Sequence, residues 1–281
     1  MPETGTGIRI ALLDSGVRVP ALRLKAGQRV TGRSFVNGTS SWNDWDGHGT
    51  RCASRLVDAQ VGLVPAAELT ALRIRRGACA TRGSLTLALR WLLEGSSQSA
   101  WDLVLFGVGF TARTRDEAPF RELQTLIREL NQRGTLLVAP SGNRDRARSR
   151  FIDHPARYAD VLSIGASLAP PQGDRAWAGN RDVGCAQQEL DFLVHGCEVP
   201  TRQLSGSLAS GFGTSFAAAN AAAFLARYLQ WRAARHGRLG HCAAQTLRAE
   251  LDRSETVHQI ALLEPAIERA ISGEGICARS A

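Results

Sequence analysis

Four polar residues spread along the chain have the side chains that acyl transfer needs. They are an acid in Asp14, an imidazole in His48, an amide in Asn143 and a hydroxyl in Ser215. Serine is a weak nucleophile until a base takes its proton, and imidazole commonly serves as that base. The set therefore predicts a nucleophile, a base, a group that orients the base and a donor for an oxyanion, provided that the fold brings the four together.

Ser215 stands in the stretch SGFGTSFAAANAAAFLA, residues 210–226, where a Gly-Thr-Ser turn precedes a run of small residues typical of a helix. The first N–H groups of a helix have no partner and carry partial positive charge, which favours an oxygen that becomes anionic there. Taken alone, Thr214 or Ser215 is more simply an N-cap. A phosphate-binding loop is a weaker interpretation, because Phe216 stands where the dinucleotide fingerprint has its third glycine or alanine.

The other three residues also have simpler structural interpretations. Asp14, in ALLDSGV, fits a turn or a cap, and His48, in DGHGTRCAS, fits a loop flanked by glycines. Asn143 follows Gly142 and fits a turn, because asparagine tolerates left-handed backbone. The acyl-transfer interpretation thus depends on the four residues occurring together.

Short apolar runs alternate with longer amphipathic stretches along the chain. This pattern predicts buried strands at 8–14, 68–74, 102–109, 134–142 and 160–167, and helices at 48–57, 84–95, 117–133 and 215–234. Such alternation favours an α/β fold with a mostly parallel central sheet that helices cover on both faces. Sites in open sheets of this kind form where the strands end at their carboxyl edges. Asp14 and Asn143 follow predicted strands, and His48 and Ser215 begin predicted helices.

Length and charge bound the class of protein. The chain has 281 residues and a net charge of +8, and Lys25 is its only lysine. Basic surfaces attract nucleic acid, anionic lipid or acidic protein segments. The arginines are scattered and form no stripe interleaved with aromatic residues, so we expect a solvated surface and no nucleic-acid partner. No linker or repeat divides the chain, so we expect one domain over 1–281, with its core at about 7–230 and a helical extension over 231–281.

Targeting signals and cysteine usage bear on the compartment. The N-terminal segment lacks a basic start, a long apolar core and a small-residue cleavage site, and no segment approaches the roughly 20 apolar residues that span a bilayer. We therefore expect a cytoplasmic protein with no membrane partner. No C-x-x-C pair occurs among the six cysteines, which disfavours metal knuckles and redox motifs. They are Cys52, Cys79, Cys185, Cys197, Cys242 and Cys277.

The segments ALLDSGV, DGHGTRCAS, APSGN and SGFGTSFAAA resemble, in this order, the aspartate, histidine, oxyanion-asparagine and serine motifs of the subtilisin-like serine proteases, or subtilases. Connecting text such as GLVPAAELTALRI and WDLVLFGVG extends the resemblance over roughly residues 7–230. It implies a three-layer subtilisin-like fold and a serine endopeptidase that works through an acyl-enzyme. Asp14, His48 and Ser215 would form the catalytic triad, and Asn143 with the Ser215 backbone N–H would bind the oxyanion.

The resemblance also implies where a peptide or protein substrate binds. An extended peptide would pair with one edge of the cleft and face the opposite wall of the S1 pocket. The residues implied are Gly107, Val108 and Gly109 on the edge, and Pro140, Ser141 and Gly142 on the wall. The segment from Ala80 to Leu85 would border the cleft farther upstream. Asp153 would lie near the S1 floor and favour a basic side chain, whereas Arg144 near the rim argues the opposite, so the P1 preference stays open.

Departures from the family pattern bear on cofactors and on the cleft. The interval from His48 to Pro65 is shorter than in calcium-loaded secreted members and offers few oxygen ligands, so we expect no calcium there and no other cofactor. The proline that usually follows the family's serine is absent, which affects cleft geometry but not the nucleophile. Cys52 lies four residues after His48, but two ligands make a poor zinc site. We interpret Cys52 as a small core residue.

Secreted subtilases usually carry a signal and a propeptide, whereas here the first core strand begins by residue 8. An unrestrained protease would damage a cytoplasm, so we expect a selective enzyme that removes a leader from one dedicated partner peptide. In this it resembles the compact subtilases of peptide-modification clusters, including those that process the small subunit of quinohemoprotein amine dehydrogenase. Two alternatives stay open: a catalytically silent module that binds a peptide or nucleic acid, and an esterase or peptide ligase with the same triad.

Overall fold

The centre of the protein is a parallel sheet. The computed structural model describes residues 4–77, 79–94, 101–110, 120–143, 152–168, 190–237, 243–251, 261–262 and 267. Within these residues the sheet has eight strands in the order β12-β9-β8-β7-β6-β1-β3-β2, and every neighbouring pair is parallel. Because all the strands run the same way, their carboxyl ends meet at one edge of the sheet.

The sheet strands are β1 (Arg9–Asp14), β2 (Val30–Ser34), β3 (Glu68–Arg73), β6 (Leu103–Phe106), β7 (Leu136–Pro140), β8 (Leu162–Ser167), β9 (Phe192–His195) and β12 (Ala261–Leu262). Two antiparallel ribbons lie outside it, one of β4 (Arg75–Arg76) and β5 (Cys79–Ala80), the other of β10 (Val199–Arg202) and β11 (Leu208–Gly211). The helices are α1 (His48–Val57), α2 (Arg82–Leu93), α3 (Arg121–Gln132), α4 (Thr214–His236), α5 (Ala243–Glu250) and a short 3-10 turn at Val19–Ala21.

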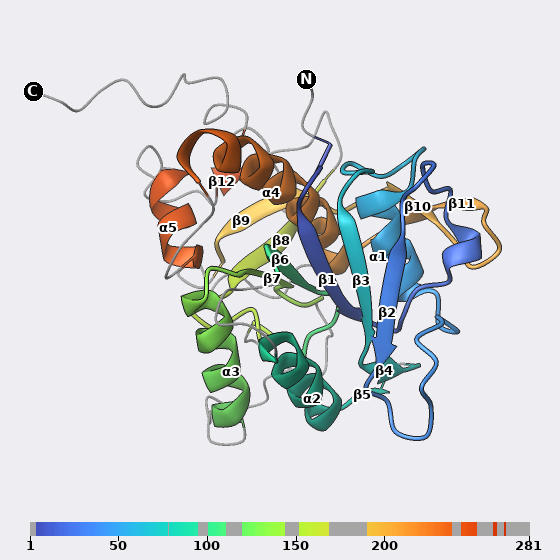
Figure 1. Ribbon diagram of the computed structural model, residues 1–281, viewed down its shortest axis with the longest axis horizontal. Helices are drawn as coiled ribbons and strands as arrows, with labels where there is room; N and C mark the ends of the chain where they lie inside the picture. Colours follow the sequence, from blue (N-terminus) through green and yellow to red (C-terminus); the bar gives the residue numbers. More distant parts are fainter. Residues whose placement is uncertain are drawn as a thin grey trace, which may run out of the picture.

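Helices cover both faces of the sheet, as Figure 1 shows. α1 and α4 pack on one face, and α2 and α3 lie side by side on the other. Successive side chains of β1 point to opposite sides: Ile10 and Leu12 join the core under α1 and α4, while Ala11 and Leu13 join the core under α2 and α3. Burial on both faces explains why this strand is an unbroken apolar run. The predicted three-layer α/β fold is confirmed.

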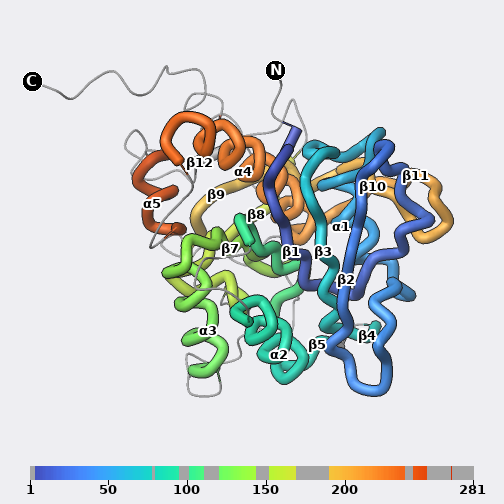
Figure 2. Tube along the Cα trace, viewed as in Figure 1, coloured from blue at the N-terminus to red at the C-terminus, as the bar shows by residue number. Residues whose placement is uncertain are grey.

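The tube in Figure 2 shows how distant segments meet at the middle of the sheet. β1 lies between β3 and β6, and β7 lies on the far side of β6. The Asp14 Cα is paired in register with Arg73 at the end of β3, and Leu13 with Phe106 at the end of β6. The segments that follow β3 and β6 therefore begin beside the end of β1.

Sequence patterns located some elements and missed others. α1 spans the predicted residues, and α4 begins one residue before its predicted start. β2 was not predicted, because it is an edge strand whose residues are alternately exposed and partly buried, with no apolar run. In the helical extension expected over 231–281, the described residues include the end of α4 and all of α5, and also the two-residue strand β12, which pairs in parallel with β9.

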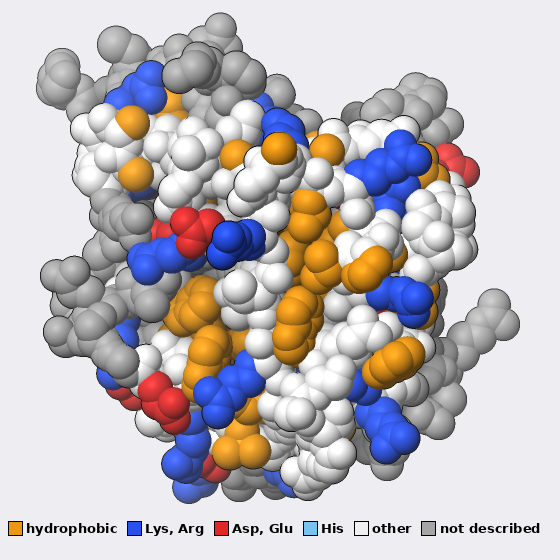
Figure 3. Space-filling view, turned by 45° about the vertical axis from the view of Figure 1, so that its right-hand side comes forward, with side chains coloured by type: hydrophobic (Ala, Val, Ile, Leu, Met, Phe, Trp, Pro, Cys, Tyr) orange, Lys and Arg blue, Asp and Glu red, His pale blue; other side chains and the backbone are white. Residues whose placement is uncertain are grey.

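None of the helices in the described part of the chain combines the length and the apolar character that crossing a bilayer requires. Figure 3 shows one face of the surface, where Lys and Arg side chains lie in separate groups, some of them beside Asp and Glu side chains. On this face they do not merge into one continuous basic patch.

Candidate active site

Three elements place the acid, the imidazole and the hydroxyl at the carboxyl edge of the sheet. Asp14 is the last residue of β1, His48 is the first residue of α1, and Ser215 is the second residue of α4. α1 and α4 pack against each other on the same face of the sheet, so the starts of both helices lie near the end of β1. The fold thus brings together the residues that the sequence singled out.

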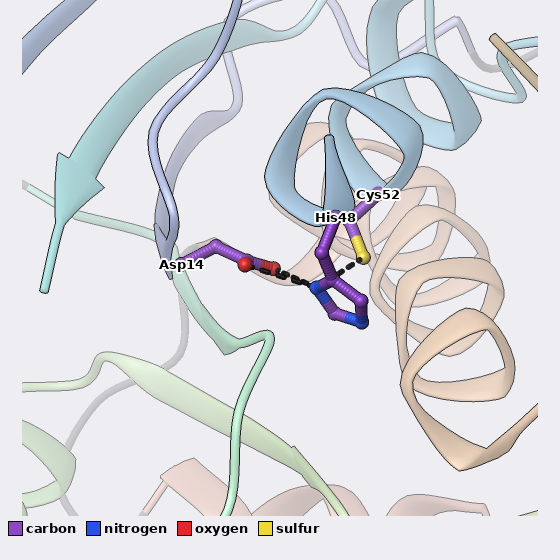
Figure 4. A group of neighbouring side chains, drawn as sticks. All are labelled: Asp14, His48 and Cys52. Atoms are coloured by element: carbon purple, nitrogen blue, oxygen red, sulfur yellow. Dashed lines mark hydrogen bonds and ion pairs between the residues drawn. The ribbon is translucent and has the colours of Figure 1, made fainter. Parts of the chain in front are cut away.

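The three side chains form a chain of hydrogen bonds. His48 Nδ1 lies 2.9 and 2.8 Å from the two carboxylate oxygens of Asp14, and His48 Nε2 lies 3.0 Å from Ser215 Oγ. Figure 4 shows the Asp14 carboxylate pointing at the His48 ring. An ionised carboxylate only accepts, so Nδ1 carries the proton and Nε2 is left to accept one from the hydroxyl. The arrangement can deprotonate Ser215 as it attacks a carbonyl carbon.

The Asp14 carboxylate is kept ionised inside the protein. Its side chain is completely buried, and Oδ1 accepts a hydrogen bond of 2.7 Å from the Ser15 backbone N–H. Burial by itself raises the pKa of Asp14, but the charge and hydrogen bond of His48, the charge of Arg75 and the Ser15 N–H together hold that pKa below its ordinary value. The carboxylate is therefore a fixed negative charge beside the imidazole.

The interaction between Asp14 and His48 raises the pKa of the imidazole, whereas it lowers the pKa of the carboxyl group. Burial alone lowers the pKa of His48, but the Asp14 charge and hydrogen bond outweigh it, and the pKa lies well above 6.5. The Phe216 ring also packs near the imidazole, with the ring centroids 5.7 Å apart. The site is thus built to stabilise the imidazolium that forms when His48 takes a proton.

Asn143 is tied to the start of α4. Its Oδ1 accepts hydrogen bonds of 3.0 Å from both the backbone N–H and the hydroxyl of Thr214, the residue before the serine. These bonds fix the orientation of the amide, so that Nδ2 is the end that can donate to a substrate oxygen. The Ser215 N–H belongs to the first turn of α4, where no intrahelical acceptor exists. Asn143 and Ser215 line the same cavity, so these two donors are the candidates for an oxyanion site.

The hydroxyl of Ser215 faces a cavity of about 390 Å³. His48, Asn143 and Thr214 line this cavity, and so do most of the residues expected to bind substrate. Those are Gly107, Val108, Gly109, Pro140, Gly142 and Asp153. Ala80, the first residue of the predicted upstream segment, also lines it. Arg144, which bears on the P1 preference, lies outside the described residues.

The prediction differs from the structure at Ser141. This residue is buried and is not part of the cavity wall, although Pro140 and Gly142 are. Its backbone N–H donates to the Ile164 carbonyl, and its carbonyl accepts from the Asp153 N–H. Side chains alternate along extended backbone, so the side chain of Ser141 is expected to point to the side opposite that of Pro140.

Arg75 is a cavity residue that sequence reasoning missed. It begins β4, directly after the predicted strand 68–74, and its Nε lies 3.8 Å from Asp14 Oδ1. Its Nη2 forms an ion pair with Asp46, which lies two residues before His48. The rule that singled out Asp14 and Asn143, inspection of residues after strands, would also have found Arg75.

Cys52 lies next to the imidazole, as Figure 4 shows. Its Sγ is 3.8 Å from His48 Nδ1, and with Asp14 the three residues place their ligand atoms within 4.8 Å of one another. A metal there would have to displace the Nδ1 proton that is donated to Asp14. Burial raises the pKa of the Cys52 thiol above its ordinary value, which keeps the sulfur protonated and a weak ligand. The thiol packs as the small core residue that we expected.

The missing proline leaves α4 unbroken. The helix continues through Ala219 to His236, and Asn220 uses both ends of its amide. Its Nδ2 donates to the His195 carbonyl at 2.8 Å, and its Oδ1 accepts from Arg55 Nε at 2.8 Å. These bonds fix the serine helix to β9 and to α1, the helix that carries His48.

Several known proteases are similar to this chain in sequence. Subtilisin BL of Lederbergia lenta is 29% identical over 224 residues, which cover 76% of this chain and 73% of that protein. The alkaline protease of Shouchella clausii is also 29% identical, over 220 residues that cover 76% of this chain and 52% of that protein.

Two solved structures share the fold. A cold adapted subtilisin-like serine proteinase superposes with a TM-score of 0.70 at 19% identity, covering 92% of this chain and 88% of its own. The prenylagaramide maturation protease PagA superposes with a TM-score of 0.74 at 20% identity, covering 96% and 95%. The family model described as Peptidase_S8, the subtilase family, matches residues 5–259. The chain therefore belongs to the subtilase family of serine proteases.

Proposed function

We propose that Ser215 is the nucleophile of this protease, His48 its general base and acid, and Asp14 the group that orients His48. The observation that carries the proposal is the pair of contacts from His48, one to the carboxylate and one of 3.0 Å to Ser215 Oγ. Ser215 Oγ attacks the scissile carbonyl carbon while Nε2 takes its proton. Nε2 then protonates the leaving amine as the C–N bond breaks, which leaves an acyl-enzyme. Water then attacks the acyl carbon while Nε2 takes its proton, and Nε2 returns that proton to Ser215 Oγ as the acyl group leaves.

Labelling with a fluorophosphonate tests this assignment directly. The probe reacts with a serine only when a base activates it, so we expect a covalent adduct on Ser215 and none after His48→Ala or Ser215→Ala. Peptide mapping of the adduct by mass spectrometry identifies the residue. An adduct on another serine in the wild-type protein would contradict the proposed nucleophile.

Asn143→Ala is expected to lower kcat by about 10²- to 10³-fold with little change in KM, the size of the loss found when a subtilisin loses the corresponding donor. The donor acts on charge that develops only in the transition state. Asn143→Asp is the companion variant, because it removes the donor but keeps an oxygen to accept from Thr214. A comparable fall in kcat for both variants identifies the donor as the cause, and a change confined to KM would refute the role.

The pH dependence of kcat/KM follows from the pKa of His48. A base must be neutral to accept a proton, and His48 keeps its proton to a higher pH than usual because of Asp14. We therefore expect kcat/KM to fall as the pH is lowered through a midpoint above 6.5, the ordinary value. Initial rates on an uncharged peptide ester measure this limb. A midpoint below 6.5 would mean that the Asp14 pair does not dominate.

We also propose that the physiological reaction is the removal of a leader from one partner peptide. Two observations support it: the likeness in fold to a protein named as a maturation protease, and a cavity that the charged residues Arg75 and Asp153 line together with Ser215. Charged groups in a cleft penalise substrates that leave them unmatched, which favours selectivity.

Selectivity is tested by competition between substrates. The enzyme is incubated with leader-bearing peptides encoded near its gene and with casein, and products are identified by mass spectrometry. We expect one cleavage site in one peptide and slow attack on casein. Equal rates on casein and on every candidate would contradict the proposed selectivity while leaving the triad untouched.

We propose the cytoplasm as the site of action. The support is that Cys52 and Cys197 are free, buried thiols, which a reducing compartment preserves. Fractionation of cells expressing the tagged full chain tests the location, and recovery of active enzyme from the medium would contradict it.

A further inference from the structure

A second cavity, of about 480 Å³, lies beside the catalytic one. Arg75 lines both cavities, so its side chain forms part of the wall between them. The second cavity is also lined by Arg73, Arg76, Asp46 and the exposed Trp45. We call it the arginine cavity. It is built from the end of β3, the β4–β5 ribbon and the loop before α1.

The charges of the arginine cavity do not balance. Asp46 is paired with Arg75, and among the described residues no carboxylate pairs with Arg73 or Arg76. Asp14, the other carboxylate near Arg75, is already hydrogen-bonded to His48. Three guanidinium groups therefore face one carboxylate, and the lining carries a formal excess of positive charge.

Two N–H donors of these arginines also lack a hydrogen-bond acceptor in the described part of the chain. Arg73 is 4% exposed and uses Nη1 to hold the Ser41 carbonyl, but its Nε is buried and has no acceptor among the described residues. The Nε of Arg75 is also buried and has no hydrogen-bond acceptor among the described residues, although Asp14 Oδ1 lies 3.8 Å away. Leaving a buried charged donor without a partner costs free energy, and an anion in the cavity would relieve that cost.

The position of the arginine cavity indicates where the anion comes from. A peptide laid along Gly107 to Gly109 with its carbonyl at Ser215 passes the wall that Arg75 forms. A side chain near the scissile bond then lies next to Arg75, the residue that lines both cavities. A carboxylate matches the planar donors of a guanidinium and forms strong charge-assisted hydrogen bonds with them.

We propose that the arginine cavity is a subsite for an acidic side chain of the substrate, within a few residues of the scissile bond. This inference rests on the proposed function, since it assumes peptide bound for attack by Ser215. It gives the substrate class a chemical definition: a peptide with Glu or Asp beside the cleavage site.

The test uses matched fluorogenic peptides that carry Glu or Gln at each position flanking the scissile bond. At low salt we expect Glu to exceed Gln in kcat/KM by about tenfold at one position, the size of one charge-assisted hydrogen bond. In Arg76→Gln this Glu-to-Gln ratio is expected to fall several-fold, and added salt lowers the ratio in the wild type because the cavity is open to solvent. Arg121→Gln, an exposed arginine on α3, is the matched control and leaves the ratio unchanged.

Two readouts separate this proposal from the proposed function. Fluorophosphonate labelling reports the triad in the same preparations, and calorimetry of Glu and Gln peptides on Ser215→Ala reports binding without turnover. Normal labelling with Gln equal to Glu at every position overturns the arginine cavity alone. An equal loss of the ratio in Arg121→Gln also overturns it, because the effect would then come from net charge. Absence of labelling overturns the proposed function, whereas a Glu preference in calorimetry still supports the subsite.

Discussion

Ser215→Ala is expected to lower kcat by about 10⁶-fold, the loss found when a subtilisin is deprived of its nucleophile. Without the hydroxyl, the acyl-enzyme route is closed, and only the oxyanion donors and substrate binding remain to accelerate attack by water. Stopped-flow assays with excess fluorogenic peptide measure the residual rate, and they should show no burst. His48→Ala combined with Ser215→Ala should cost little more than either change alone, since the two residues act as a unit.

Ser205→Ala is the matched control for the serine variant. Ser205 is exposed in the turn between β10 and β11, where its hydroxyl contacts only the neighbouring Ser207 in the described residues. This variant should cleave and label as the wild type does. Retention of near wild-type turnover by Ser215→Ala would show that a different group attacks the substrate.

The second large effect is expected for Asp14→Asn, which should lower kcat by about 10⁴-fold at neutral pH, as the corresponding change does in another serine protease. An amide can donate a hydrogen bond to Nδ1 and so stabilise the tautomer with its proton on Nε2. In that tautomer Nε2 cannot accept the proton of Ser215. Steady-state kinetics on a peptide ester measure the loss.

Asp102→Asn serves as the control for the aspartate variant. Its Oδ2 accepts a hydrogen bond of 2.8 Å from the Arg9 backbone N–H at the start of β1, the opposite end of the strand that carries Asp14. Asparagine keeps an acceptor there, so kcat should be preserved. Thermal unfolding of both variants separates misfolding from a tautomer effect. An Asp14→Asn enzyme that is folded and nearly as active would refute the orienting role.

The residues that we propose as catalytic were accessible to sequence reasoning because the local signals were strong. Asp14 ends an apolar run that is buried on both faces, and the starts of α1 and α4 are each marked by a glycine before the functional residue. Parallel strands bring their carboxyl ends to one edge, so the order of these segments already placed the four side chains near one another. The alternation of strands and helices gave the fold class for the same reason.

The remaining features depend on contacts between segments that carry no local pattern. The position of Arg75 is set by the β4–β5 ribbon, whose two-residue strands are too short to produce a periodic pattern in the sequence. β12 is equally short and is a strand only because β9 offers it a free edge. Ser141 was misplaced because the resemblance assigned a run of residues to the wall, whereas the direction of each side chain is decided by the backbone that Ile164 and Asp153 hold.

Gly107, which we expect to pair with the substrate peptide, also lies directly against Asp14. A Cβ at this position would lie 1.9 Å from Asp14 Oδ2, so any larger residue would push the carboxylate away from the imidazole. The same backbone segment would thus contact the substrate on one side and the Asp14 carboxylate on the other. Substitutions at position 107 therefore cannot be used to change the substrate specificity by laboratory evolution. Changes in specificity must come from other residues that line the cavity. In a saturation library of active clones, this position should remain invariant.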